Sequence, residues 1–282
     1  MWLWIILIVA VVAIGVTLVI LFVPGASTSN AVLTRGRPEP YEPPPARTDT
    51  TPKPSADRTE VAPFRPDTDS EMNLYDQIAA SLDGVDLSTE NPEQRMSVKY
   101  VSPDATVLEL GASIGRNTLV LSRLTGDSNR LVTLEPNQRS VKRLTERRDR
   151  FGMKFNIVNG ALSDVPLYLK GYQAYTADDP RMPSDAEEIK TISWPELRSQ
   201  YPDHKFDTLI ADCEGCLFPA LRDHPDMLDG INLVQVEHDW VYRDHYHWFR
   251  TLMANKGFES IDSQTLDRWK HPLFLEVFRR IA

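Results

Sequence analysis

The chain has 282 residues, a formal net charge of −9 and 25% charged residues. This length allows one large domain or two small ones, and an acidic surface repels phosphate backbones. We therefore expect no nucleic acid among its partners.

Residues 2–23 contain no charged side chain and consist mainly of Leu, Ile, Val and Ala. A helix over this run would be about 33 Å long, enough to cross a hydrocarbon core of roughly 30 Å. A cleaved signal peptide has a basic start and a shorter apolar core, which this run lacks. We therefore predict a transmembrane anchor over residues 1–23. Arg35 and Arg37 follow the span and favour a cytosolic domain of a single-pass membrane protein, with a lumenal domain as the alternative.

Residues 24–70 hold ten of the 21 prolines and few large apolar residues. Such a segment cannot bury enough surface to offset the entropy lost on ordering. The sequence therefore predicts a disordered proline-rich stalk over 24–70 and one folded domain over 71–282.

The folded part begins with two helices, one with apolar residues at helical spacing between Leu74 and Leu82 and a short one over 92–100. Further along, apolar runs typical of buried strands are expected at 106–110, 131–135, 155–158, 206–211, 232–237, 258–262 and 273–278. Helical patterns are expected at 117–124, 138–151, 217–222 and 246–256. A hairpin at 165–175 and a polar loop at 176–187 interrupt this alternation. Alternating strands and helices predict an α/β fold with a mainly parallel seven-stranded sheet, in which one of the last two strands is antiparallel.

A hydrophobic strand, a tight glycine turn and a helix start follow one another at residues 107–117. Glycines in such a turn let the backbone approach a ligand closely, and the helix start adds free N–H groups. The candidate cofactor-binding residues in this motif are Glu109, Gly111, Ala112, Ser113, Gly115 and Asn117.

Three ligand classes use this geometry. A dinucleotide site has glycine where Ser113 stands, and its pyrophosphate would be repelled by Glu109. The run 111–115 also matches the G-x-S-x-G turn of hydrolases, with Asp212 and His238 following in the Ser–Asp–His order, but those enzymes place several strands before the turn. Glu109 instead suits the cationic amino end of S-adenosylmethionine.

Glu135 ends the second predicted strand, where an acidic side chain can accept hydrogen bonds from both ribose hydroxyls. A dehydrogenase shares this device, and a carboxylate near a helix start can also serve only to complement the helix dipole. Together with Glu109, this residue favours S-adenosylmethionine as the cofactor.

The chain resembles the FkbM-type methyltransferases over roughly 106–278. The resemblance rests on blocks that occur in chain order at 109–118, 135–137, 159–163, 189–194, 206–215 (ending in D-x-E-G) and 234–238. It implies a Rossmann-like class I methyltransferase that uses S-adenosyl-L-methionine. It also implies a hydroxyl-bearing acceptor on a sugar, glycan or small metabolite. The resemblance adds further cofactor-binding residues, namely Pro136, Asn137, Gly160, Ala161 and Asp212.

Asp212, Glu237 and His238 lie at the carboxyl ends of the two middle strands, which form the ligand-binding edge of such a sheet. We expect Asp212 or His238 to deprotonate a hydroxyl while Glu237 orients the imidazole or the acceptor. The alternatives are a structural role for His238, a helix-capping role for Glu214, and a divalent metal held by Asp212, Glu237 and His238. We expect no metal. The polar loop 176–187 is expected to lie above the site.

The two cysteines, Cys213 and Cys216, have C-x-x-C spacing. Structural zinc requires a second ligand pair, which the chain lacks, and a thiol redox site is typical of a helix start after a thioredoxin-type strand, so we favour neither. The competing function is a non-catalytic, membrane-tethered adaptor on a degenerate methyltransferase fold. The acidic residues Glu109 and Glu135 argue against the adaptor.

Overall fold

The computed structural model describes residues 72–126, 129–239, 243–266 and 273–281. The predicted anchor and stalk over 1–70 lie outside these ranges. Within them, none of the helices is long and apolar enough to cross a membrane.

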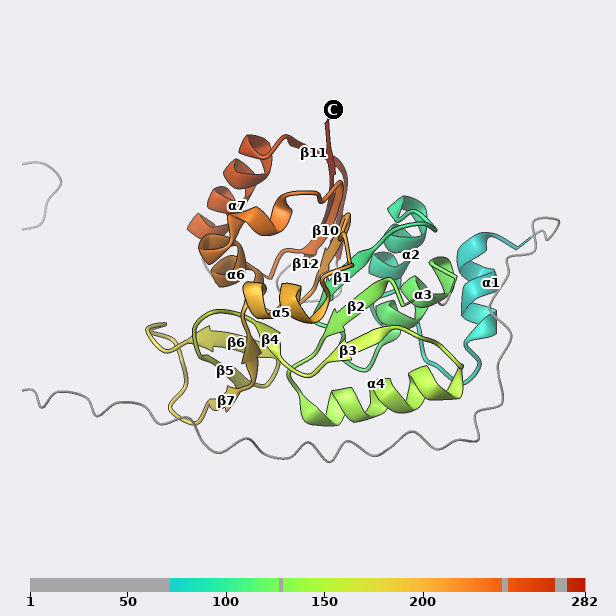
Figure 1. The fold of residues 1–282 in the computed structure, drawn as a ribbon, viewed down its shortest axis with the longest axis horizontal. Coiled ribbons are helices and arrows are strands. Elements are labelled where there is room, and N and C mark those ends of the chain that lie inside the picture. Colours follow the sequence, from blue (N-terminus) through green and yellow to red (C-terminus); the bar gives the residue numbers. More distant parts are fainter. Residues whose placement is uncertain (1–71, 127–128, 240–242, 267–272, 282) are drawn as a thin grey trace, which may run out of the picture. The chain divides into compact units, whose positions relative to one another are not determined.

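A seven-stranded sheet forms the centre of the domain, in the order β11-β12-β10-β9-β1-β2-β3 (Figure 1). Its strands are β1 (Val107–Leu110), β2 (Leu131–Leu134), β3 (Asn156–Val158), β9 (Thr208–Ala211), β10 (Leu233–Glu237), β11 (Phe258–Leu266) and β12 (Leu273–Arg280). Only β12 runs antiparallel to its neighbours, β10 and β11. The predicted mainly parallel sheet with one antiparallel strand is therefore confirmed.

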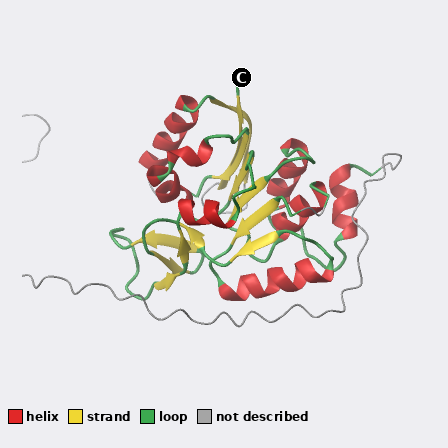
Figure 2. Cartoon of the chain, in the orientation of Figure 1, coloured by secondary structure: helices red, strands yellow, loops and turns green. Residues whose placement is uncertain are grey.

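Each face of the sheet is covered by helices because successive strand residues point to opposite sides. Val107 and Leu131 belong to one buried cluster, and their neighbours Leu108 and Val132 belong to the other. The first cluster is covered by α1 (Leu74–Ser81), α2 (Asn91–Tyr100), α3 (Arg116–Leu124) and α4 (Gln138–Arg150). The second is covered by α5 (Trp194–Gln200), α6 (Leu217–Asp223), η1 (Pro225–Leu228) and α7 (Arg243–Asn255). Figures 1 and 2 show the two helical layers with the strands between them.

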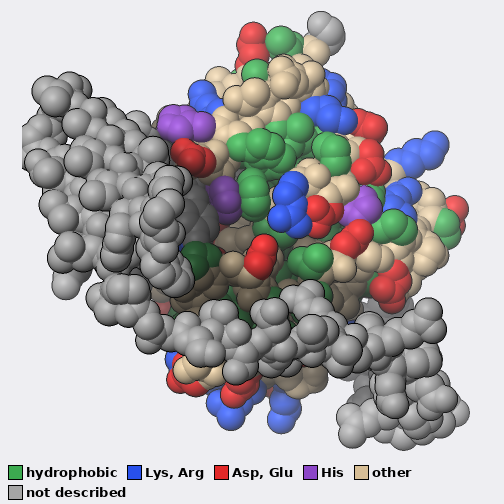
Figure 3. Space-filling model, turned by 90° about the vertical axis from the view of Figure 1, so that its left-hand side faces the viewer, with side chains coloured by type: hydrophobic (Ala, Val, Ile, Leu, Met, Phe, Trp, Pro, Cys, Tyr) green, Lys and Arg blue, Asp and Glu red, His purple; other side chains and the backbone are tan. Residues whose placement is uncertain are grey.

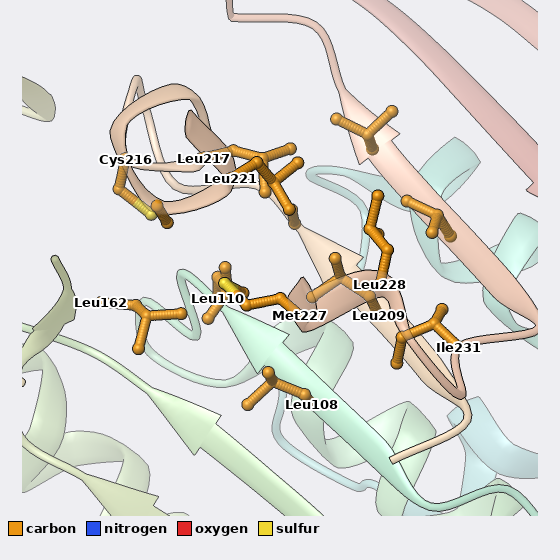
Figure 4. Close-up of a cluster of buried hydrophobic side chains, with 14 of the residues drawn as sticks. Leu108, Leu110, Leu162, Leu209, Cys216, Leu217, Leu221, Met227, Leu228 and Ile231 are labelled. Carbon is orange, nitrogen blue, oxygen red and sulfur yellow. The ribbon is translucent and has the colours of Figure 1, made fainter. Parts of the chain in front are cut away.

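The second cluster packs the ends of the middle strands against α6 and η1 (Figure 4). Leu108 and Leu209 come from the sheet, Leu221 comes from α6 and Leu228 from η1, and each is at most 1% exposed. This packing holds the strand ends that form the candidate site.

Two small sheets lie beside the main one. β5 (Leu167–Lys170), β6 (Gln173–Thr176) and β7 (Glu187–Ile189) form an antiparallel sheet in the order β6-β5-β7, and β4 (Ala161–Leu162) pairs with β8 (Thr191–Ile192). The predicted hairpin at 165–175 is confirmed by the β5–β6 pair. Helix α5 was not predicted; it begins where the Ser193 side chain accepts a hydrogen bond from the Glu196 N–H.

Acidic and basic side chains are interspersed on the face of the domain drawn in Figure 3. No single charge type dominates the described surface in that view, so the ligand site is identified from its cavity.

Candidate functional site

A cavity of about 390 Å³ opens at the carboxyl ends of the middle strands. Small-molecule sites commonly have volumes of roughly 300–1,000 Å³. Its lining includes Gly111 after β1, Glu135 after β2, Asp212 after β9 and Glu237 at the end of β10. The cavity therefore lies at the predicted ligand-binding edge of the sheet.

The turn after β1 makes a close approach that only glycine allows. Gly111 has φ 92°, and a Cβ built on it would lie 1.7 Å from the backbone oxygen of Asp212. The turns after β1 and β9 are therefore in direct contact, and both line the cavity.

Gly115 has a different role from Gly111. It precedes α3 with φ 89°, and a Cβ there would lie 2.4 Å from Leu144 Cδ1 on α4. Gly115 does not line the cavity. Gly115 was predicted to contact the cofactor, but in the structure it lets the start of α3 pack closely against α4.

Glu135 is held at the cavity wall by two backbone donors. The N–H of Ser113 donates to its Oε2 and the N–H of Asn137 donates to its Oε1, both at 2.7 Å. Burial raises the pKa of this carboxyl, while the two hydrogen bonds oppose that rise. Each carboxylate oxygen has a further lone pair, so Glu135 can accept hydrogen bonds from ligand hydroxyls.

Most of the other predicted cofactor-binding residues also line this cavity. They are Ser113, Pro136, Asn137, Gly160 and Ala161. They come from three separate turns, after β1, β2 and β3, which the parallel sheet brings to one edge.

Glu109 does not line the cavity. Its carboxylate is buried below the turn, where Oε2 accepts hydrogen bonds from the hydroxyls of Thr118 at 2.7 Å and Thr133 at 2.6 Å. Burial raises its pKa to about 7. Because β1 alternates its side chains, Leu110 reaches the cavity and Glu109 points to the opposite face. The expected direct contact between Glu109 and the amino end of the cofactor is therefore corrected.

Ala112 and Asn117 are also buried away from the cavity lining. The Asn117 side chain donates to Glu93 Oε1 at 3.1 Å and accepts from the Ser97 hydroxyl at 3.0 Å. This hydrogen-bonded group joins α2 to α3, so Asn117 supports the site from behind.

Asp212 and Glu237 are neighbours across two parallel strands. Ala211 pairs with Val236 in the β9–β10 ladder, so the residues that follow them extend from the same register. Both line the cavity, and among the described residues neither carboxylate accepts a hydrogen bond. Burial, followed by the charge of Glu237, raises the pKa of Asp212 well above its usual range. Burial and then Glu214 raise the pKa of Glu237 to about 7.

His238 lies outside the cavity lining. Its Nε2 is 2.8 Å from Glu276 Oε2, and its ring packs edge-on against Tyr246 and Phe249. Burial lowers its pKa, while the hydrogen bond with Glu276 and the charge of that carboxylate oppose the fall. His238 follows Glu237 directly, and the strand alternation turns it to the other side. The expectation that His238 is a catalytic base is therefore corrected to a structural role.

The three residues considered for a metal do not converge, because His238 is paired with Glu276. Within the ranges that the structure describes, no group of three or more His, Cys, Asp or Glu side chains is arranged to hold a metal ion.

Part of the cavity wall comes from segments that no sequence pattern indicated. Residues Thr89, Glu90 and Pro92, before and at the start of α2, line it, as do residues of the β5–β6 hairpin from Leu169 to Ala174. The polar loop 176–187, expected above the site, contributes instead to a second hollow of about 230 Å³. The only local signal for the hairpin contribution is Gly171, which allows its tight turn with φ 65°.

Comparisons with known proteins give similar folds but no family. No protein-family model matches the chain, and no curated protein matches it. Among solved structures, an rRNA methylase from Streptococcus thermophilus is 10% identical with a TM-score of 0.46, over 68% of this chain and 95% of that one. A putative tRNA (m1A22) methyltransferase from Streptococcus pneumoniae, solved with S-adenosyl-L-methionine, is 11% identical with a TM-score of 0.44, over 67% and 72%. A putative RNA methyltransferase from Pyrococcus horikoshii is 14% identical with a TM-score of 0.43, over 72% and 89%.

The expected exclusion of nucleic acid as a partner is corrected, because these similar structures include proteins described as rRNA and tRNA methyltransferases. Net charge is a sum over the whole chain and does not report local patches. Helix α4, for example, carries six basic residues: Arg139, Lys142, Arg143, Arg147, Arg148 and Arg150.

Proposed function

We propose that the chain is an S-adenosylmethionine-dependent methyltransferase of the FkbM type that methylates a hydroxyl group of its acceptor. One observation carries this proposal. A single cavity has the carboxylates of Glu135, Asp212 and Glu237 in its lining. Glu135 stands where a carboxylate can accept hydrogen bonds from ribose hydroxyls, and the carboxylates of Asp212 and Glu237 accept no hydrogen bond from the described residues. The D-x-E-G block at 212–215 supports the FkbM type. A sugar or small-molecule hydroxyl is the acceptor that this resemblance implies.

The residues present fit the cofactor at both ends. Leu134, Pro136, Ala161 and Leu162 give an apolar wall beside Glu135, which suits an adenosyl group. Elsewhere in the lining, Asp212 complements a sulfonium or an ammonium group when its carboxyl is ionised. Because residue 111 is a glycine in close contact with the Asp212 backbone, it adds no side chain to this part of the cavity.

When bound, S-adenosylmethionine supplies an electrophilic methyl group for in-line displacement. The chain then has to align the acceptor and remove its proton. Glu237, with a pKa near 7, is suited to take that proton at neutral pH. Asp212 lies beside it and, when ionised, favours positive charge near the reacting atoms.

The test is calorimetric binding of S-adenosylhomocysteine to the full chain, followed by transfer of labelled methyl groups from S-adenosylmethionine to panels of sugars, small alcohols and RNA. Micromolar binding with labelling of a hydroxyl supports the proposal. Binding with transfer only to a base nitrogen of RNA overturns the acceptor class and leaves the cofactor. Absence of binding favours the adaptor.

We also propose that residues 1–23 anchor the chain in a membrane, with the domain on the cytosolic side. The support is the charge-free apolar run and the arginines that follow it at 35 and 37. Protease protection in sealed microsomes tests both points. A chain that washes off the membrane at alkaline pH contradicts the anchor, and a protected domain contradicts the cytosolic side.

A further inference from the structure

The two cysteines of the chain form part of the cavity wall. Cys213 comes two residues after β9 ends, Cys216 directly precedes α6, and a disulfide joins them. Cys213, Glu214 and Cys216 line the cavity, whereas Gly215 lines the second hollow. The four-residue turn 213–216 is therefore a partition between the two spaces.

The backbone of the partition has two residues in the left-handed conformation, and hydrogen bonds and the disulfide stabilise it. Glu214 has φ 54° and Gly215 has φ 102°, and left-handed conformation is unfavourable for a residue other than glycine. The Gly215 N–H donates to Asp239 at 2.6 Å, and the Glu214 carbonyl accepts from Ala174 N at 2.9 Å. The disulfide closes this short turn and removes alternative conformations that the chain would otherwise sample.

The two sulfurs differ in access. Both cysteines line the cavity, but Cys216 is only 4% exposed whereas Cys213 is partly exposed. A strand, a C-x-x-C pair and a helix follow one another here, which is the context that a thiol redox site requires. A reductant that enters the cavity would therefore meet Cys213 first.

We propose that Cys213 and Cys216 form a reversible thiol–disulfide site that controls cofactor binding. The disulfide holds the cavity wall, and reduction to the dithiol loosens the partition and weakens binding of the cofactor. This inference rests on the proposed function, because it concerns the same cavity. The co-reactant is a dithiol reductant.

Reduction of the disulfide proceeds as a two-step thiol–disulfide exchange. One thiolate of the dithiol attacks Cys213 Sγ, the Cys213–Cys216 bond breaks, and Cys216 leaves as a thiolate that takes a proton. The second thiol of the reductant then attacks its own mixed-disulfide sulfur as a thiolate. This step releases Cys213, which is protonated, and leaves the reductant as a cyclic disulfide. Two electrons pass from the reductant to the cysteine pair.

Cofactor binding and reduction must then oppose each other, since linkage is reciprocal. A ligand that binds the disulfide form more tightly makes that form harder to reduce, and reduction in turn weakens binding of the ligand. A bound ligand also covers the access route to Cys213. Both effects slow reduction of the disulfide.

The experiment uses the full chain, first oxidised with excess oxidised glutathione and checked by peptide mapping for the 213–216 bond. Dithiothreitol is then added with and without S-adenosylhomocysteine, and free thiols are alkylated and counted by mass. With ligand at about ten times its Kd we expect reduction to slow about tenfold, because only the free fraction reacts. Calorimetry on the reduced chain should show affinity lower by about tenfold, since the wall is no longer preorganised.

The matched control is the double variant Cys213→Ser/Cys216→Ser. Because the chain has no other cysteine, dithiothreitol should leave ligand binding by this variant unchanged, at the weaker affinity of the reduced chain. If the variant does not fold, the ligand affinities of the oxidised and reduced forms of the unmodified chain still decide the question.

The outcomes separate the two proposals. Ligand affinity that is the same with and without dithiothreitol overturns this inference and leaves the proposed function, even if the bound ligand slows reduction. Failure of the bond to form under the oxidant also overturns the inference alone. Absence of ligand binding by the disulfide form overturns both.

Discussion

The backbone N–H of Ser113 and the carboxylate of Glu135 are joined by a hydrogen bond of 2.7 Å. The contact links the glycine turn after β1 to the end of β2, so two parts of the cavity wall are fixed against each other. Ser113 has φ 48°, in the left-handed region, so the chain does not continue as a strand at this residue. The carboxylate is therefore oriented before any ligand binds.

The first prediction concerns Glu135→Gln. The amide cannot accept hydrogen bonds from both backbone N–H groups, because one of its two atoms is itself a donor. It also loses the charge that strengthens bonds to ribose hydroxyls. We expect affinity for S-adenosylhomocysteine, measured by calorimetry, to fall about 10- to 100-fold, the range for a hydrogen bond to a charged group.

Glu146→Gln is the matched control, since Glu146 is exposed on α4 and does not line the cavity. It should bind the ligand with unchanged affinity. Equal binding by both variants would mean that Glu135 does not hold the ribose.

The second prediction concerns Asp212 and Glu237. Asp212→Ala should abolish methyl transfer and also weaken binding of S-adenosylmethionine, because the lost carboxylate serves the cationic end of the cofactor and lies beside the proposed base, Glu237. With Glu237 as the base, turnover should rise as pH increases through about 7, where its carboxyl loses its proton. Glu237→Gln should remove that rise.

The check is a pH–rate profile of labelled methyl transfer, with ligand affinity measured alongside. His238→Gln is the informative comparison, because His238 lies outside the cavity lining and pairs with Glu276. It should lower stability and keep the shape of the profile. A profile that flattens in His238→Gln and persists in Glu237→Gln would restore the histidine as base.

The central strands β1, β2, β9 and β10 could be predicted from sequence because both faces of the sheet are covered by helices, which makes each of these strands a mainly apolar run. Short elements could not. β4 has two residues, Ala161 and Leu162, and exists only because β8 lies beside it. Helix α5 depends on a capping serine, Ser193, that looks like an ordinary loop residue.

The sequence predicts those site residues that directly follow a predicted strand. Glu135 and Asp212 follow strands directly, and both reach the cavity. Glu109 was assigned from its charge and His238 from its place at a strand end, but the alternation of side chains along each strand turns both away from the cavity. The wall formed by the β5–β6 hairpin comes from a distant segment, so no local pattern around the glycine turn could indicate it.

The third prediction concerns Gly111→Ala. A Cβ at this position would lie 1.7 Å from the Asp212 oxygen, and φ 92° is unfavourable for alanine. Because both obstacles are backbone, we expect the free energy of unfolding to fall by at least about 3 kcal/mol in urea titrations. Gly257→Ala, with φ 77° and open space around it, should cost only about 1–2 kcal/mol. Similar losses in the two variants would contradict the close approach of the turns.

The last prediction concerns the buried Glu109 and the pH dependence of stability. In the folded chain its pKa is raised from 4.5 to about 7 by burial, so the fold favours the neutral acid. The stability linked to this group is therefore present below pH 4.5 and is lost as pH rises through 7, amounting to about 3 kcal/mol. Glu109→Gln is neutral at every pH and its carbonyl can still accept from Thr118 and Thr133. Between pH 4 and pH 8 its unfolding free energy should fall by about 3 kcal/mol less than that of the unmodified chain. Other buried carboxyls shift both proteins equally, so parallel curves for the two would show that Glu109 is ionised in the fold.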